Sequence, residues 1–207
     1  MKQAKSIAKK SPSKANRLAA VSGAPGEVRV ISGKWRGRKL AVLDADGLRP
    51  TSDRVKETLF NWLMHDIDGA NVLDCFSGSG SLAIEALSRY ASHATLIERE
   101  LPLAKNLTKN LTLLKCDNAN VVNKDCLSWL ANTATQQYNV VFIDPPFRKE
   151  LAINCCQALE KNNWLAENAL VYLETEKELK VAELPVNWRL LKEKIAGQLA
   201  YRLYQRS

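Results

Sequence analysis

The strongest fold signal in this 207-residue chain is Val72-Leu73-Asp74-Cys75-Phe76-Ser77-Gly78-Ser79-Gly80-Ser81-Leu82. An apolar run ends in an acid, a turn with two glycines follows, and a helical pattern begins after Gly80. Glycines let a backbone adopt positive φ and approach a ligand closely. An acid at the end of the strand can bind a cationic group. The stretch therefore predicts a strand, a ligand-binding loop and a helix, in that order.

Strand and helix patterns keep alternating after this stretch. The expected strands are 71–75, 94–98, 119–122, 139–143 and 169–174, and the expected helices are 80–90, 101–114, 126–132 and 149–160. Two more strands, 188–196 and 199–205, follow one another without a helix and are expected to form an antiparallel closing pair. This order predicts an α/β, Rossmann-like fold with a mostly parallel seven-stranded sheet and helices on both faces.

The glycine loop is compatible with two classes of ligand. Gly78-Ser79-Gly80-Ser81-Leu82-Ala83 satisfies the dinucleotide pattern G-x-G-x-x-G/A. Dinucleotide folds usually place their glycines directly after the strand, whereas Asp74-Cys75-Phe76-Ser77 intervenes here. An anionic Asp74 would also sit poorly beside a pyrophosphate. Both features favour S-adenosylmethionine, whose amino group Asp74 can bind, over a nicotinamide cofactor.

Two further acids follow later strands. Glu98 comes 18 residues after Gly80 and can accept hydrogen bonds from both ribose hydroxyls of an adenosine. Asp125 can accept from the adenine amino group or cap the helix 126–132, and both readings stay open. The expected cofactor contacts are Asp74, Phe76, Gly78, Gly80, Glu98 and Asp125.

The motif Asp144-Pro145-Pro146-Phe147 predicts the chemistry. It follows the buried strand 139–143. Proline stiffens the turn, so the Asp144 carboxylate and the Pro145 carbonyl become two fixed acceptors for the N–H donors of a base amino group. Phe147 can stack on a base that has left its helical stack. We expect these four residues to form the catalytic loop of an amino-group methyltransferase.

The basic charge lies almost entirely in the first quarter of the chain. Residues 1–56 carry 14 Lys/Arg against 4 Asp/Glu, and residues 57–207 carry 16 against 18. We expect a disordered basic tail over 1–25, a basic hairpin and loop over 26–52, and a methyltransferase domain over 53–207 that opens with a helix capped by Ser52 or Asp53. The first helix of that domain is expected over 53–65. The charge asymmetry indicates a polyanion-binding region.

Within the hairpin, Trp35 lies among cations. Its ring can stack on a base, or it can simply cover the edge of the core, and the sequence does not separate these readings. The expected RNA contacts are Lys34, Trp35, Arg36, Arg38, Lys39, Arg49 and Arg54.

Cysteine and histidine usage excludes several classes. Five cysteines without a C-x-x-C pair, and only two histidines, argue against a disulfide framework or a zinc site, so we expect no metal and a reducing cytoplasm. No apolar run reaches the ~18 residues that a membrane span requires, and no secretory signal is evident, so we expect no membrane partner.

These motifs together resemble a known family, the bacterial 16S ribosomal RNA guanine-N2 methyltransferases called RsmD. The similarity runs from about Val28 to Arg206. It is carried by Trp35 to Leu40, Gly47 to Thr51, Asp53 to Val55, Glu57 to Trp62, Asp74 to Phe76, Asp144 to Phe147 and Ala200 to Arg206.

The resemblance implies a specific reaction. It implies a class I methyltransferase fold, S-adenosylmethionine contacts at Asp74, Gly78, Gly80, Glu98 and Asp125, and a catalytic loop at Asp144–Phe147. It further implies methylation of a guanine amino group, at position 966 of 16S rRNA, on 30S subunits or assembly intermediates by a monomer. The alternatives are an adenine-N6 DNA or RNA methyltransferase, a nicotinamide oxidoreductase and a non-enzymatic RNA-binding protein.

Overall fold

A computed structural model describes residues 26–43, 52–146, 151–179 and 183–207. The predicted tail 1–25, Arg49 and Phe147 lie outside the described residues. No helix of the described segments is long and apolar enough to cross a membrane.

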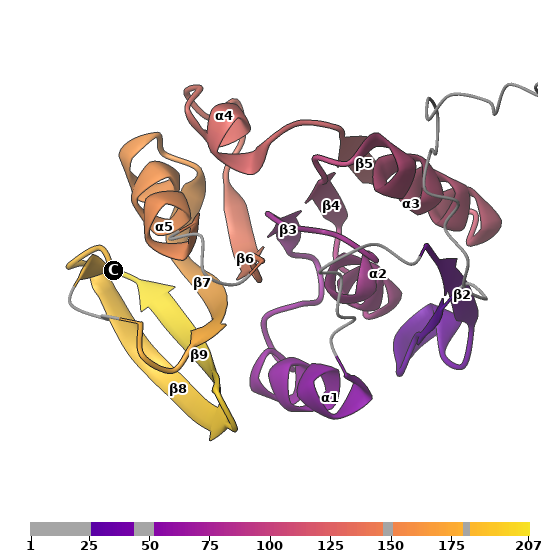
Figure 1. Cartoon of the computed structure of the whole chain (residues 1–207), viewed down its shortest axis with the longest axis horizontal. Helices are drawn as coiled ribbons and strands as arrows, with labels where there is room; N and C mark the ends of the chain where they lie inside the picture. Colours follow the sequence, from indigo (N-terminus) through magenta and orange to yellow (C-terminus); the bar gives the residue numbers. More distant parts are fainter. Residues whose placement is uncertain (1–25, 44–51, 147–150, 180–182) are drawn as a thin grey trace, which may run out of the picture.

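A seven-stranded sheet with the order β5-β4-β3-β6-β7-β9-β8 forms the centre of the molecule (Figure 1). The parallel strands are β3 (Asn71–Asp74), β4 (His93–Ile97), β5 (Ala119–Val122), β6 (Tyr138–Ile143) and β7 (Leu165–Glu176). The final pair, β8 (Trp188–Ala196) and β9 (Leu199–Arg206), is antiparallel, with β9 inserted between β7 and β8. The predicted mostly parallel sheet with its closing pair is confirmed.

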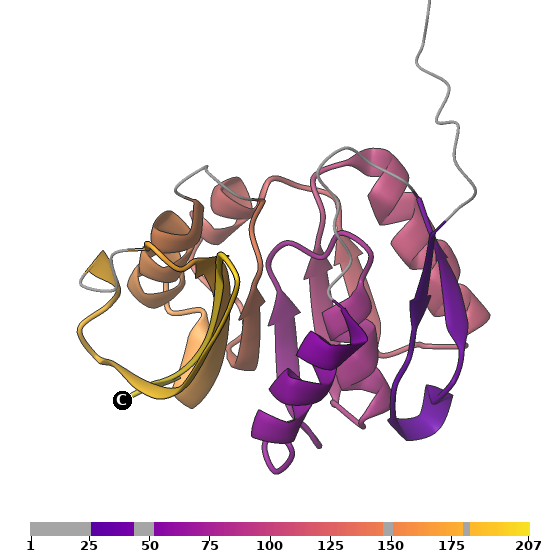
Figure 2. The same ribbon diagram turned by 60° about the horizontal axis from the view of Figure 1, so that its bottom comes forward.

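Helices cover both faces of this sheet (Figure 2). One face packs against α1 (Asp53–Trp62), α2 (Ser81–Ser88) and α3 (Leu101–Leu113), and the other packs against α4 (Cys126–Leu130) and α5 (Leu151–Lys161). Neighbouring strand residues alternate between the two cores: Val72 faces the first cluster and Leu73 the second. Both are fully buried, as a sheet covered on both sides requires.

The basic N-terminal segment forms a hairpin of β1 (Gly26–Arg29) and β2 (Lys39–Val42), joined through a 3-10 turn at Gly33–Trp35. It is packed on the main domain, because Val30 and Leu40 belong to the same core cluster as α2 and α3. The hairpin approaches α2 so closely that a Cβ on Gly33, which has a φ of 79°, would lie 1.8 Å from the Ser88 carbonyl oxygen.

A buried carboxylate fixes the hairpin to α2. Glu85 is 1% exposed and accepts hydrogen bonds from the backbone N–H groups of Ile31 and Ser32, at 2.7 and 3.0 Å. It also accepts from Arg89 Nε at 2.8 Å. Burying a carboxylate is costly unless it is paired and hydrogen-bonded, and here three donors meet that demand.

Element boundaries differ from the sequence expectation at a few ends. Helix α1 ends at Trp62, three residues before the predicted end at 65, and Ser52 is its cap, with its hydroxyl oxygen accepting from the Val55 N–H at 3.4 Å. Strand β7 begins at Leu165 instead of 169. The first part of β7 contains the exposed Glu167 and Asn168, and Asn168 has a φ of 57°. This part therefore lacks the continuous apolar pattern that predicted the strand from residue 169 onwards.

Candidate cofactor and catalytic site

The acids expected to bind the cofactor meet at one edge of the sheet. Asp74 ends β3, Glu98 follows β4 and Asp125 follows β5, and these strands are parallel neighbours. The carboxyl ends of parallel strands therefore place all three on the same edge, which is where α/β sheets bind their ligands.

The glycine loop is tightly constrained. Gly78 and Gly80 have φ values of 48° and 75°, in the left-handed region that favours glycine. A Cβ on Gly80 would lie 2.5 Å from Leu107 Cδ2 of α3, so this glycine is needed for packing between helices. The Ser77 N–H donates to the Ile97 carbonyl at 2.9 Å and ties the loop to the end of β4.

Glu98 holds the loop through its side chain. It is 8% exposed, and Oε2 accepts from the Gly78 N–H at 2.9 Å. Oε1 accepts from the Glu100 N–H at 2.7 Å. A carboxylate has about four lone-pair sites, so these bonds leave acceptor capacity for ribose hydroxyls.

Asp74 is the most perturbed acid of this edge. It is 3% exposed, and burial raises its pKa to about 7, with a smaller contribution from the charge of Glu98. Hydrogen bonds from the backbone at Ala83 and Phe76 partly counter this rise. The pKa stays raised because no cation offsets the desolvation of this carboxyl group. The ammonium group of a bound ligand would supply that positive charge.

Asp125 is exposed and caps α4, because its Oδ1 accepts from the Ser128 N–H at 2.9 Å. The capping reading is confirmed, while contact with an adenine stays a prediction. Phe76 is half-buried and packs against the core on the α4–α5 side of the sheet.

The predicted catalytic loop begins beside Asp74. In the sheet register Asp74 lies opposite Phe142, and the Cys75 N–H donates to the Phe142 carbonyl at 3.0 Å. Asp144 follows two residues after Phe142 and is half-buried, Pro145 is buried and Pro146 is exposed. The acceptors predicted to orient a base amino group therefore start at the edge that carries the cofactor acids.

The cations of the hairpin are mostly exposed, but several have protein partners. Lys39 pairs with Glu27 at 2.9 Å, and Arg38 donates to the Leu113 carbonyl at 3.4 Å. Trp35 is half-buried against the core, and the Lys34 ammonium lies 4.4 Å from the centroid of its ring. Trp35 therefore covers the edge of the core, which was one of the two interpretations of this residue. RNA contact at this surface stays a prediction.

Tertiary structure also gathers three cysteines that sequence spacing gave no reason to group. Cys75 lies in the turn after β3, Cys126 begins α4 and Cys155 lies in α5. All three are buried and free, and their sulfur atoms lie within 4.8 Å of one another. Burial is the main reason that the pKa of Cys75 is raised. They pack among apolar side chains between β6, α4 and α5. Cys75 and Cys126 directly follow the predicted cofactor acids Asp74 and Asp125 in the sequence.

Comparison with known proteins shows the family. The model for the family described as "Conserved hypothetical protein 95" matches residues 28–205. The "Ribosomal RNA small subunit methyltransferase D" of Escherichia coli K12 is 56% identical over 181 residues, covering 87% of this chain and 91% of that protein. The chain belongs to the RsmD family.

Solved structures agree with this assignment. A structure described as "Putative methyltransferase yhhF from Escherichia coli" has a TM-score of 0.82 and 52% identity and covers 87% of this chain and 98% of that one. A putative SAM-dependent methyltransferase from Streptococcus mutans is only 16% identical but shares the fold, with a TM-score of 0.64 over 89% of this chain and 56% of its own length. The RsmD-family fold seen here is therefore that of a class I S-adenosylmethionine-dependent methyltransferase.

Proposed function

We propose that this protein transfers a methyl group from S-adenosylmethionine to the exocyclic N2 amino group of a guanine in 16S ribosomal RNA. The observation that carries the proposal is the placement of Asp144 and Pro145 at the end of β6, next to the strand that ends in Asp74. The E. coli relative named as a small-subunit rRNA methyltransferase supports the substrate class. The position of the guanine, 966, stays a prediction of the family resemblance.

The described residues fit the cofactor. Asp74 offers a buried carboxylate to the amino group of its methionine part, and Glu98 offers acceptors to its ribose. When bound, S-adenosylmethionine supplies an electrophilic methyl group on a sulfonium. The chain itself then has to bind, align and exclude water, and it needs no nucleophile of its own.

Asp144 has the central role in this proposal. A guanine amino nitrogen is a poor nucleophile because its lone pair is delocalised into the ring. Hydrogen bonds from its two N–H groups to the Asp144 carboxylate and the Pro145 carbonyl would align that nitrogen. The carboxylate would also stabilise positive charge as it develops on the nitrogen, which is a preorganised electrostatic contribution.

The partner and the setting follow from the substrate. We infer that the protein acts as a monomer in the cytoplasm, on rRNA within 30S subunits or their assembly intermediates. Exposed cations of the hairpin, Lys34, Arg36, Arg38 and Lys39, and Arg54 on α1, would contact the phosphates.

The test uses 30S particles from cells that lack this protein, labelled S-adenosylmethionine and single-turnover conditions. Asp144→Ala should lower the transfer rate by ~100-fold or more, the scale of losing one preorganised electrostatic contact, while Asp144→Asn should retain more activity. Cofactor affinity should change little in either variant. Transfer by the alanine variant at nearly the wild-type rate would refute the role of Asp144.

Product analysis separates the alternatives. Mass spectrometry of the nucleosides should show N2-methylguanosine. An adenine-N6 methyltransferase would give N6-methyladenosine instead, and a non-enzymatic RNA-binding protein would give no methylated nucleoside.

A further inference from the structure

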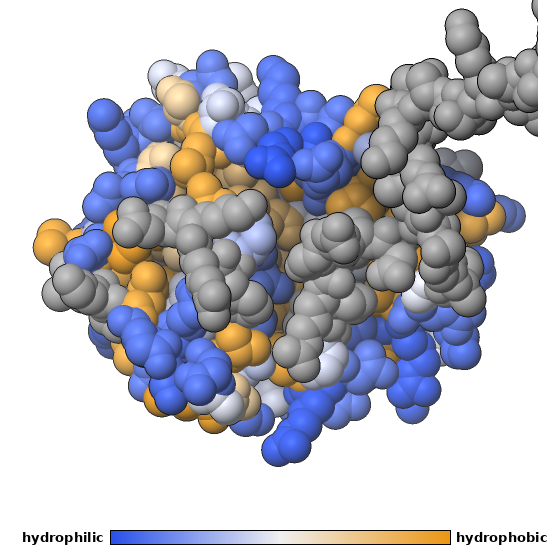
Figure 3. Space-filling view, in the orientation of Figure 1, coloured by the Kyte–Doolittle hydropathy of each residue, from blue (hydrophilic) through white to orange (hydrophobic). Residues whose placement is uncertain are grey.

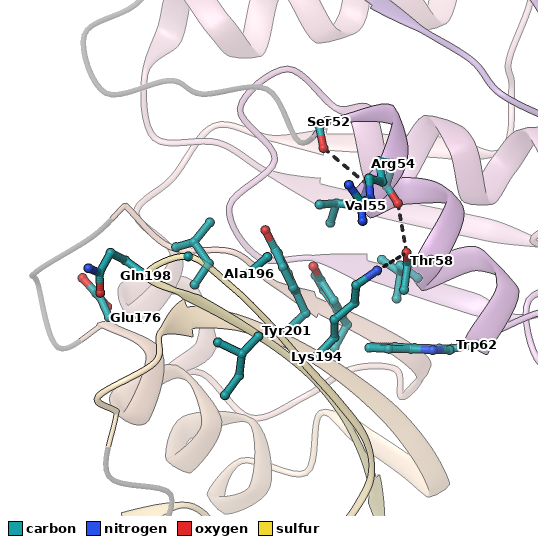
Figure 4. A pocket seen from close by; sticks show the side chains of 15 residues that line it. Ser52, Arg54, Val55, Thr58, Trp62, Glu176, Lys194, Ala196, Gln198 and Tyr201 are labelled. Atoms are coloured by element: carbon teal, nitrogen blue, oxygen red, sulfur yellow. Dashed lines mark hydrogen bonds between the residues drawn. The ribbon is translucent and has the colours of Figure 1, made fainter.

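A cavity opens between α1 and the β8–β9 hairpin. Its volume is about 830 Å³, and Figure 4 shows side chains from both elements facing one another across it. The lining includes the aromatic rings of Trp62 and Tyr201 and the cationic side chains of Arg54 and Lys194. Binding sites for small molecules span roughly 300–1,000 Å³, so the space suits a ligand of nucleotide size.

Strand β7 connects the cavity with the end of β6, where the predicted catalytic loop begins. Tyr172 lines it and lies opposite Phe142 in the register of β6 and β7, two residues before Asp144. The pKa of Tyr172 is raised mainly by burial and further by the nearby charges of Glu174 and Asp144, so the tyrosine and the catalytic acid are electrostatic neighbours. A strand of RNA whose guanine reaches Asp144 would therefore pass this cavity with an adjacent nucleotide.

One cation is held in place at the cavity. The Lys194 ammonium donates to Thr58 Oγ1 at 3.1 Å, a bond that links β8 to α1, and Thr58 Oγ1 in turn donates to the Arg54 carbonyl at 3.0 Å (Figure 4). An ammonium has three donors, and the Thr58 bond engages one of them. Lys194 is half-buried, so its charge acts at lower dielectric than that of a fully exposed lysine.

The chemistry of the lining favours single-stranded RNA. Aromatic rings accept unstacked bases and cations accept phosphates, and this combination is what proteins use on RNA loops. Glu176 is the one carboxylate among the lining residues, so the charge of the lining is net positive. Figure 3 shows that hydrophobic residues come to the surface within this face of the molecule while hydrophilic residues dominate its rim.

We propose that the cavity between α1 and the β8–β9 hairpin binds the nucleotide next to the target guanine, with its base against Trp62 and Tyr201 and its phosphate at Lys194 and Arg54. When the guanine leaves its stack, its neighbour loses a stacking partner, which is unfavourable. An aromatic cavity beside the catalytic loop replaces that partner and so favours the extruded state. The proposal rests on the proposed RNA methyltransferase function.

The first experiment measures methyl transfer to 30S particles from cells that lack this protein, as a function of particle concentration. Lys194→Ala should raise KM about tenfold, the scale of one charge-assisted contact, and leave cofactor affinity unchanged. The salt dependence of binding should become shallower by ~0.7, as for one lost phosphate contact with a single strand. Lys194→Arg should restore most of the affinity.

Lys192→Ala is the matched control, because Lys192 is an exposed lysine on the same strand that does not line the cavity. It should keep a KM close to that of the wild type. Equal effects of the two alanine variants, or a KM for Lys194→Ala within twofold of the wild type, would overturn the proposal. A wild-type protein that transfers no methyl group to RNA would instead overturn the proposed function.

A second measurement places the nucleotide directly. Gln198 lines the cavity at the turn between β8 and β9, is exposed, and can be replaced with the photo-crosslinking residue p-benzoylphenylalanine. Crosslinks should map within one or two nucleotides of the methylated guanine. Crosslinks that are absent, or confined to distant nucleotides, would show that RNA does not occupy this cavity.

Discussion

The raised pKa of Asp74 makes cofactor binding depend on pH in a defined direction. With a pKa of about 7 in the protein without cofactor, Asp74 holds a proton below neutrality. An ammonium binds the ionised carboxylate, so affinity should rise as pH rises towards 7. The amino group of the ligand stays largely protonated over that range, because α-amino groups titrate at ~7.7–8.0.

The magnitude follows from the fraction of Asp74 that is ionised. A group with a pKa of about 7 is roughly 3% ionised at pH 5.5 and about half ionised at pH 7. Affinity should therefore increase about 15-fold between these values, which corresponds to ~1.6 kcal/mol.

Calorimetry with S-adenosylhomocysteine at a series of pH values measures this directly, since that ligand keeps the amino group and is chemically stable. Asp74→Asn should bind more weakly at pH 7 and lose the pH dependence. Asp117→Asn is a suitable control, because Asp117 is exposed and lies away from the cofactor edge, before β5. A wild-type affinity that is flat from pH 5.5 to 7, or an unchanged slope in Asp74→Asn, would refute the reasoning.

Three other variants test separate parts of the structure. Glu98→Ala should weaken cofactor binding by about 1–3 kcal/mol in calorimetry, because it removes ribose acceptors and the bond that holds the Gly78 N–H; unchanged affinity would remove Glu98 from the site. Glu85→Ala should lower the free energy of unfolding by ~3–5 kcal/mol in urea titrations, because two backbone donors and Arg89 lose a buried carboxylate, and a loss below ~1 kcal/mol would contradict its anchoring role. Neutralising Arg36, Arg38 and Lys39 together should weaken RNA binding and flatten its salt dependence by ~0.7 per phosphate contact without changing cofactor affinity, and normal binding across a salt titration would exclude the hairpin as an RNA surface.

The order of elements could be read from the sequence, because the periodicity of apolar residues encodes it. The buried run before Asp74 and the glycines after it identified β3 and its loop, and the motif after residue 143 marked the end of β6. Asp74, Glu98 and Asp125 meet because parallel strands bring their carboxyl ends to one edge, so the location of the candidate cofactor site followed from the predicted topology. The start of β7 at Leu165 was missed, because exposed polar residues and a left-handed Asn168 interrupt the apolar pattern there.

The sequence by itself thus determined the fold class, the family and the edge of the sheet that carries the acids, since each depends on local pattern and chain order. Only the tertiary structure decided that Asp74 is buried enough to titrate near neutrality and that Glu98 holds the glycine loop. It also decided that Glu85 anchors the basic hairpin and that β9 enters between β7 and β8, which forms the cavity opposite α1. Burial, desolvation and a cavity between distant segments arise from contacts across the chain, and no local pattern of residues encodes them.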